Sequence, residues 1–556
     1  MVFTSPSPST PLPTKPVHEL AFGYLKQHIK DRPDQPIYTN FHTQEDVYGQ
    51  DIIDRSTAIA KFLLKLGLTK GDYVVTAVEN GWEYICVNQG ASLIETALSG
   101  ANPIYTEYEL AHQITLCSAK VVLVQDYVVP RILNIINKCP QISTIIYVGN
   151  IKPTTTKNII IINIRDIIND KAYKNNDPLP KVEIDIKTDV FTLPTSSGTT
   201  GLPKGVKVTH FANAFIFENF VNHFTNNIGK KIENDWNWRN EKILLTVPLG
   251  FVFGQFVSTM CMFAGARGIF VNGGDIQDVV DAIDKYQITL NFVSPLTLVQ
   301  LIRYKKEHPE SLKSIKTLFS SGGPIKEQVA ADVAKYFPYV KLAGQLYGLT
   351  EAMCICVHDA VVRGPLTSVG RIMSNAELRI VDPETSAELT INQPGVVQVK
   401  VHTHTIGYIN NPEANKDLFT PDGFVDTGDI GYLDERGFLF LVDRKKEMIK
   451  VGGKQVSPSE LEDILMSIPG VKDCAVVGLP DPVTDERTTG FVVKSNSSLT
   501  EKNCLEAVNI KVNEFKQITG GIYFLDAIPR NPNGKLLRRK IKERFDEIAK
   551  TKPSCT

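Results

Sequence analysis

Helix-type and strand-type segments alternate along the first half of the chain, and this alternation most restricts the folds open to it. Apolar residues that share one helix face recur in the first such segment, at Ile59, Phe62, Leu63 and Leu66. Short β-branched runs follow at residues 73–78, 121–124, 145–148 and 159–162. Helices placed between such runs predict an α/β fold with layered, parallel sheets.

A chain of 556 residues exceeds what one hydrophobic core serves, so we expect more than one domain. The polar stretch 444–446 separates two apolar runs, and beyond it Ser457, Pro458 and Glu460 form a helix-start signal. We therefore expect a large N-terminal domain at 19–443, a hinge at 444–446 and a small, mobile α+β domain at 447–556.

The first 18 residues contain five prolines among serines and threonines. This composition predicts a disordered leader at residues 1–18, because a signal peptide needs an apolar core.

Composition excludes several classes of protein. The formal net charge is −1, so we expect no nucleic-acid partner, and no apolar run is long enough for a transmembrane segment. The nine cysteines are scattered, which argues against a disulfide framework or a zinc site. A cytoplasmic location is the expectation. The C-terminus does not end in the peroxisomal signal Ser-Lys-Leu, but a peroxisomal location stays open. The oligomeric state also stays open.

Residues 195–205 follow a strand-like run and combine three glycines, five hydroxyls and a lysine. Exposed backbone N–H groups, hydroxyl donors and one cation are what phosphate binding needs. A Walker A loop is excluded because Pro203 precedes Lys204 and Gly205 follows it. A flexible surface linker is the alternative, but linkers rarely end in Pro-Lys-Gly before a strand-like run.

The segment TSSGTTGLPKGV at 195–206 resembles the signature loop of the acyl-adenylate-forming superfamily. This superfamily includes acyl-CoA synthetases, 4-coumarate–CoA ligases, luciferases and the adenylation domains of peptide synthetases. The resemblance covers about residues 20–545, with later motifs in the expected order. It implies ATP, Mg²⁺ and coenzyme A as ligands and a small-molecule carboxylic acid as substrate. It also implies nucleotide contacts from Thr195, Ser196, Ser197, Gly198, Thr199, Thr200, Gly201 and Lys204.

Residues 344–351 resemble the second nucleotide motif of this superfamily. Tyr347 offers a flat face for adenine, and Thr350 offers a hydroxyl for the α-phosphate. Glu351 is a hard oxygen ligand that suits Mg²⁺. A simple turn between a strand and a helix is the alternative. The resemblance adds Gln345, Leu346, Gly348 and Gly322 to the expected nucleotide-binding residues.

The remaining motifs lie toward the C-terminus. By resemblance, Asp429 and Arg444 reach the ribose, and Lys446 is the hinge residue. The resemblance also implies that Lys535 is the catalytic lysine. The other expected catalytic residues are Lys204, Thr350 and Glu351. One cation between two anions would align them and stabilise the charge of the transition state. The resemblance also implies that Lys450, Gly452 and Gly453 contact CoA. The two glycines would let the backbone lie close to its pantetheine arm.

The sequence departs from the relatives at the expected acyl side. Gly250 and Phe251 stand where luciferases and coumarate ligases carry histidine, and Ser321 stands where glycine is common. Luciferase-type oxidation and a phenylpropanoid substrate are therefore less favoured. The expected substrate pocket consists of Phe251, Phe253, Ser321, Gly322, Gly323 and Gly348.

These motifs predict an ATP-dependent acid–thiol ligase of the acyl-CoA synthetase type. It would activate a hydrophobic acid as acyl-AMP and pass the acyl group to CoA. Three alternatives stay open: delivery of the acyl group to a carrier protein, a luciferase-like oxidative enzyme, and a non-catalytic binding relative.

Overall fold

The computed structural model describes residues 1–151, 159–196, 203–451, 454–481, 484–495, 497–512, 514–530 and 536–549. The chain forms two compact units. The larger unit consists of Phe3–Leu378 and Val399–Asp426, and the smaller one of Met1–Val2, Arg379–Gln398 and the described part of 427–556. Their boundaries fall inside strands β20 (Ala376–Val381), β21 (Gly395–Val401) and β22 (Val425–Leu433). The expected boundary at 444–446 remains a prediction.

The larger unit contains a seven-stranded sheet whose strands pair in parallel except at one edge. Its order is β12 (Val208–Thr209), β9 (Val190–Thr192), β5 (Ala97–Gly100), β4 (Tyr73–Ala77), β6 (Val121–Gln125), β7 (Thr144–Val148) and β8 (Ile160–Asn163). The four β-branched runs predicted as strands are therefore confirmed.

A nine-stranded sheet forms the second layer of strands, and its central strands are parallel. Its order is β19 (Arg371–Ile372), β18 (Met353–Val357), β17 (Leu342–Leu349), β16 (Thr317–Ser320), β15 (Leu290–Val293), β13 (Lys242–Leu245), β14 (Arg267–Phe270), β2 (Tyr38–Asn40) and β3 (Asp46–Val47).

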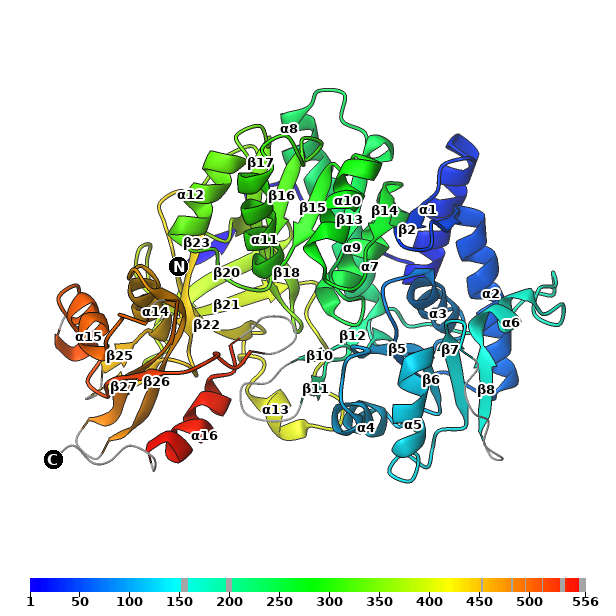
Figure 1. The fold of residues 1–556 in the computed structure, drawn as a ribbon. Coiled ribbons are helices and arrows are strands. Elements are labelled where there is room, and N and C mark those ends of the chain that lie inside the picture. The colour runs from blue at the N-terminus through cyan, green and yellow to red at the C-terminus, as the bar shows by residue number, and fades with distance from the viewer. Residues whose placement is uncertain are drawn as a thin grey trace. The chain divides into compact units, whose positions relative to one another are not determined.

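Helices cover both faces of each sheet, because alternate strand residues point to opposite sides. Val74 enters the central core and Val75 the outer one. The central core is bounded by α1 (Val17–Asp31), α2 (Gly49–Lys65), α3 (Trp82–Ser92), α7 (His210–His223) and α9 (Val252–Ala264). The outer cores are covered by α4 (Glu107–Leu116), α5 (Val129–Asn134), α10 (Ile276–Tyr286), α11 (Pro295–Glu307) and α12 (Glu327–Tyr336) (Figure 1).

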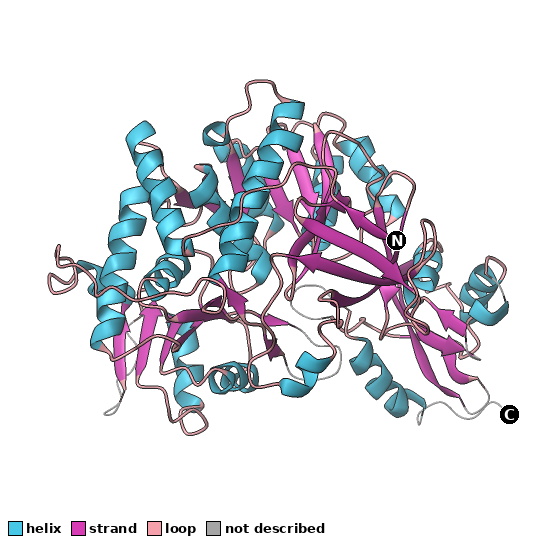
Figure 2. Cartoon of the chain, turned by 180° about the vertical axis from the view of Figure 1, so that it is seen from behind, coloured by secondary structure: helices cyan, strands magenta, loops and turns pink. Residues whose placement is uncertain are grey.

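Two further five-stranded sheets are formed, one with strands divided between the two units and one wholly in the smaller unit, and their strands are among the arrows in Figure 2. One has the order β1 (Val2–Thr4), β20, β21, β22 and β23 (Leu439–Arg444). The other consists of β25 (Lys454–Val456), β24 (Ile449–Val451), β27 (Asp485–Lys494), β26 (Val471–Asp481) and β28 (Ile522–Phe524). Its faces are packed by α14 (Pro458–Met466), α15 (Glu501–Asn509) and α16 (Arg538–Ala549). The predicted large α/β part and small α+β part are confirmed.

The N-terminal segment differs from the predicted disordered leader. Thr10 is buried, and its hydroxyl donates to Asn219 Oδ1 at 2.7 Å. Its backbone exchanges two hydrogen bonds with the side chain of Asn375. Proline-rich composition signals a lack of regular structure, but polar side chains on distant elements can still hold an extended segment in place.

In the part of the chain that the structure describes, no helix is long and apolar enough to cross a membrane.

Candidate functional site

The predicted phosphate loop connects two short strands of the larger unit. Strand β10 (Thr195–Ser196) pairs antiparallel with β11 (Lys204–Gly205), so that Thr195 lies opposite Gly205 and Ser196 opposite Lys204. The base is closed further by the Val206 amide, which donates to the Pro194 carbonyl at 2.8 Å. The two ends of the loop are therefore held together by backbone pairing, and Lys204 lies at this paired base. Its tip, with Ser197, Gly198, Thr199, Thr200 and Gly201, lies outside the described residues.

A distant segment, residues 405–409, pairs with the other edge of this hairpin. The Ile409 amide donates to the Gly205 carbonyl at 2.9 Å, and the Lys207 amide donates to the Gly407 carbonyl at 3.0 Å. Val206 lies opposite Tyr408 in an antiparallel bridge. Because backbone pairing fixes the position of each side chain, Tyr408 is held directly beside Lys204.

Tyr408 connects two of the predicted site residues. The Lys204 ammonium lies 4.9 Å from the centre of the Tyr408 ring, and the Tyr408 hydroxyl donates to Glu351 Oε1 at 2.8 Å. Burial, followed by the nearby Glu351 carboxylate, raises the pKa of Tyr408 well above its usual range, so the hydroxyl keeps its proton. Tyr408 was missed in the sequence, because a Gly-Tyr pair in a polar loop carries no distinctive local pattern.

The second nucleotide motif occupies the end of β17 and the turn that follows it. Thr350 and Glu351 lie in this turn and are partly exposed. The Cβ of any larger residue at Gly348 would stand 2.0 Å from the Met353 carbonyl oxygen, so the close pairing of β17 with β18 requires glycine there.

The residues before the turn have structural partners. The Gln345 side chain donates to the carbonyls of Leu366 and Ser368 at 2.7 and 2.8 Å. Leu346 belongs to the central core, and Tyr347 is 7% exposed. Thr350 and Glu351 are thus the partly exposed polar residues at the end of this motif, and the nucleotide contacts of all five residues remain predictions.

The predicted acyl-pocket residues follow the carboxyl ends of neighbouring parallel strands. Residues 250–253 come after β13, residues 321–323 after β16, and Gly348 lies near the end of β17. Since β13, β15, β16 and β17 pair in parallel in this order, these segments share one edge of the sheet. Ligands of open α/β sheets commonly bind at such an edge.

The residue at position 250 is restricted by packing. A Cβ on Gly250 would stand 2.6 Å from the Ala101 carbonyl oxygen, so the backbones of residues 250 and 100–101 are in direct contact. Phe251 follows as the residue that precedes α9, and both Phe251 and Phe253 are partly exposed. Ser321 is tied by its amide to the Val293 carbonyl at 3.1 Å, next to Gly322 with a φ of 93°.

The predicted ribose-binding residues form an ion pair in the smaller unit. Asp429 lies opposite Arg444 across β22 and β23, and Arg444 Nε is 2.7 Å from Asp429 Oδ1. Asp429 is nearly buried, whereas Lys446 and Lys450 are exposed. Gly452, Gly453 and Lys535 lie outside the described residues. The structure therefore brings Asp429 and Arg444 together, and the roles of all these residues remain predictions.

The hinge predicted at 444–446 is bordered by polar contacts that sequence reasoning did not single out. Just before it, Asp443 Oδ2 accepts hydrogen bonds from the Ser457 hydroxyl at 2.9 Å and the Ser459 amide at 3.1 Å. Just after it, Glu447 is 2.6 Å from Arg538, which also pairs with Glu462. Asp443 thus holds the start of α14 in this arrangement of the smaller unit.

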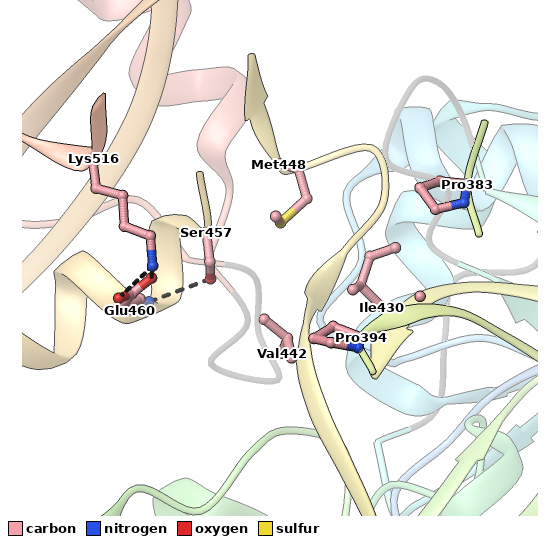
Figure 3. Close-up of a pocket in the computed structure, with 9 residues that line it drawn as sticks. Pro383, Pro394, Ile430, Val442, Met448, Ser457, Glu460 and Lys516 are labelled. Carbon is pink, nitrogen blue, oxygen red and sulfur yellow. Dashed lines mark hydrogen bonds and ion pairs between the residues drawn. The ribbon is translucent and has the colours of Figure 1, made fainter. Parts of the chain in front are cut away.

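A cavity of about 290 Å³ lies beside these contacts. Figure 3 shows Ile430, Val442 and Met448 around one part of it, and the Lys516–Glu460 ion pair at another. Its other lining residues are Pro383, Pro394, Gly395 and Ser457. All of these lining residues belong to the smaller unit, and they come from chain segments before and after residues 444–446.

The described residues contain no group of three or more His, Cys, Asp or Glu that could hold a metal ion. The Glu351 carboxylate, with one oxygen bonded to Tyr408, offers a single protein ligand of the kind that Mg²⁺ takes. Such a site fits a magnesium ion that binds mainly through substrate phosphates.

Comparison with known proteins agrees with this geometry. Residues 25–409 match the AMP-binding enzyme family, and residues 460–535 match the AMP-binding enzyme C-terminal domain. The chain therefore belongs to the AMP-binding enzyme family of adenylate-forming acyl-CoA ligases, and the predicted membership is confirmed.

The most similar relatives include plant and amoebal proteins. The chain is 33% identical to the probable 4-coumarate–CoA ligase 1 of Dictyostelium discoideum over 555 residues, covering 97% of each chain. It is 32% identical to a 4-coumarate–CoA ligase of Humulus lupulus, covering 98% of this chain and 96% of the relative. Its fold matches that of ATP-bound MatB from Rhodopseudomonas palustris with a TM-score of 0.81 at 22% identity, covering 96% of this chain and 100% of the other.

Proposed function

We propose that this protein uses ATP to activate a hydrophobic carboxylic acid as acyl-AMP and then transfers the acyl group to coenzyme A. The observation that carries the proposal is the placement of the phosphate hairpin beside the Glu351 turn. There a cation, Lys204, contacts the ring of Tyr408, and a carboxylate suited to Mg²⁺, Glu351, accepts a hydrogen bond from its hydroxyl. A site for a magnesium-bound polyphosphate needs both kinds of group.

In the first step a carboxylate oxygen of the acid attacks the α-phosphorus of ATP. The new P–O bond gives acyl-AMP, and the bond to pyrophosphate breaks with its electron pair. Lys204, the hydroxyls of the hairpin and Thr350 would bind the phosphates, and Glu351 would hold Mg²⁺, which supplies charge neutralisation when bound. Lys535 would steer the attacking carboxylate toward the phosphate.

In the second step the sulfur of CoA attacks the acyl carbonyl carbon, and AMP leaves. We propose that the part of the chain beyond Lys446 turns between the steps, withdrawing Lys535 and presenting Gly452 and Gly453. Asp429 and Arg444 would bind the ribose, since a carboxylate accepts two hydrogen bonds at once. Element-end residues such as 444–446 are suited to absorb a change of backbone direction.

The hydrophobic character of the acid is supported by apolar side chains near the predicted pocket. Phe251 and Phe253 are partly exposed at the sheet edge. Leu296 and Val299 are 55% and 46% exposed on α11, whose first residue, Pro295, lies 3.4 Å from the Cβ position of Gly323. Apolar surfaces of this kind bind apolar acyl groups by excluding water.

A product analysis tests the proposal. The protein is incubated with Mg²⁺, ATP and a panel of aliphatic and aromatic acids that includes 4-coumarate, with and without CoA, and products are identified by mass spectrometry. We expect acyl-AMP without CoA and acyl-CoA with it. Acyl-AMP that never reacts with CoA would instead support a carrier-protein acceptor. Failure of every acid to release pyrophosphate would contradict the proposed activity.

A further inference from the structure

We infer that Tyr408 is a positioning residue that orients the metal-binding carboxylate of Glu351 and keeps the Lys204 ammonium apart from it. This inference rests on the proposed function, because it assumes that Lys204 and Glu351 serve Mg²⁺-ATP. It adds a third group, from a segment far away in the sequence, to the two that the motifs predict.

The backbone of Tyr408 is firmly held. Its amide donates to Asn415 Oδ1 at 2.7 Å, and Asn415 Nδ2 donates back to the Tyr408 carbonyl at 3.2 Å. Val206 pairs with it on the other side. A tyrosine with this support holds its ring in one place, so its hydroxyl and its ring face act from fixed positions.

The Tyr408 hydroxyl determines which oxygen of Glu351 stays available. It donates to Oε1, and the amide of Thr405 donates to the Glu351 backbone carbonyl at 2.8 Å. The Glu351 turn is thus tied at both its backbone and its side chain to residues 405–408. With Oε1 occupied, Oε2 is the oxygen left for a metal ion, and a single orientation is selected.

The ring of Tyr408 acts on Lys204. The ammonium lies 4.9 Å from the ring centre, at the distance of a cation–π contact. Among the residues that the structure describes, Lys204 and Glu351 form no ion pair with each other, although each contacts the same tyrosine. A direct ion pair would neutralise the two groups that must bind phosphate and metal separately. The ring therefore stabilises the lysine without engaging the carboxylate.

Packing alone would explain a half-buried aromatic residue, but it would not explain the hydroxyl. Phenylalanine would fill nearly the same volume as tyrosine. It would lack only the hydroxyl that donates a hydrogen bond to Glu351. The structural and the positioning roles consequently make different predictions for Tyr408→Phe and Tyr408→Leu.

The test measures equilibrium binding of ATP to the full-length protein, with and without Mg²⁺. For Tyr408→Phe we expect about a tenfold loss of affinity with Mg²⁺ and no change without it, as for one lost charge-assisted hydrogen bond. In the Glu351→Gln background, Tyr408→Phe should have no further effect, which a double-mutant cycle measures directly. For Tyr408→Leu we expect a loss without Mg²⁺ as well, and this added loss should vanish in the Lys204→Ala background.

Tyr108→Phe is the matched control, because Tyr108 is 64% exposed on α4. Thermal unfolding establishes that the variants are folded, and Tyr408→Phe keeps the ring in place if Tyr408→Leu does not fold. Equal loss of ATP affinity with and without Mg²⁺ in Tyr408→Phe would overturn the inference, as would additivity with Glu351→Gln. Wild-type protein that binds no ATP would overturn the proposed function along with it. Acid-dependent pyrophosphate release by the wild-type, with unchanged Mg²⁺ dependence in Tyr408→Phe, would overturn the inference alone.

Discussion

Gly250 is a residue whose identity has a steric reason. Its α-carbon lies against the Gly100–Ala101 backbone, where no side chain fits. Glycine at this position is therefore required by the close packing of residue 250 against residues 100–101.

Gly250→Ala should accordingly destabilise the protein by about 1–3 kcal/mol, because a Cβ 2.6 Å from a carbonyl oxygen forces the backbone to move. The matched control is Gly23→Ala, at an exposed position of α1 where a Cβ meets nothing within 4 Å. We expect that control to stabilise the protein by roughly 0.5–1 kcal/mol. Thermal and denaturant unfolding measure both. Equal effects of the two substitutions would contradict the packing argument.

His18 determines part of the response to pH at the same scale. It is buried, its Nδ1 lies 2.7 Å from the Ser92 hydroxyl, and burial followed by the nearby His210 lowers its pKa from 6.5 to about 3. Below pH 6.5, His18 therefore binds a proton in the unfolded chain but stays neutral in the folded chain until the pH approaches 3. Stability should fall as the pH drops from about 6.5 toward 3, by about 1–2 kcal/mol at pH 5.

His18→Gln removes this titration and keeps a neutral polar group. We expect the variant to be less stable than the wild-type at pH 7.5 and to lose less stability between pH 7.5 and pH 5. Unfolding midpoints at the two pH values test the difference. A slope as steep as that of the wild-type would show that His18 is not responsible. His223, whose pKa burial lowers to about 4, acts in the same direction in both proteins.

The N-terminal segment is the element that local patterns described least well. Residues 5–13 form no regular structure, yet Thr10 is clasped by Asn219 on α7, by Asn222 on the same helix and by Asn375. These hydrogen bonds hold the start of the chain against one face of α7 and against Asn375. An extended segment can thus act as an element of the fold when its polar groups are satisfied.

Thr10→Val should destabilise the protein by about 1–3 kcal/mol, because it leaves the buried Asn219 oxygen and Asn222 amide with one partner fewer. Ser9→Ala, at an exposed neighbouring position, should have little effect. Hydrogen exchange of α7 and cleavage of residues 1–16 by a protease report the loss locally. Identical protection from hydrogen exchange and proteolysis in the two variants would contradict a stabilising role of the Thr10 hydrogen bonds.

At the scale of the whole molecule, the proposed mechanism assigns residues of the two units to successive steps. Lys535→Ala should slow adenylation by orders of magnitude and largely spare thioester formation from supplied acyl-AMP, since a lysine that aligns two anions serves the first step only. Lys540→Ala, exposed on α16, is the control and should change neither step. Measuring the two half-reactions separately decides the matter: equal loss of both would rule out alternation about Lys446.

Much of the architecture was already present in local patterns. The β-branched runs became strands of the seven-stranded sheet, and the helix-start signal at Ser457 became the beginning of α14, where its hydroxyl accepts the Glu460 amide. These features are local, because periodicity, caps and turns depend on residues a few positions apart. Family membership was also predictable, since the phosphate loop and the motif at 344–351 are contiguous stretches of sequence.

Only the tertiary structure brought Tyr408 into contact with both Lys204 and Glu351, paired Asp443 with the start of α14, and explained Gly250 through Gly100 and Ala101. Each of these contacts joins side chains or backbone that no repeat, motif or spacing connects. The sequence by itself determined the layers, the family and the chemical groups of the site, because these depend on local order along the chain. Which groups meet was decided by sheet pairing and packing, because close contact in space is set by the whole fold.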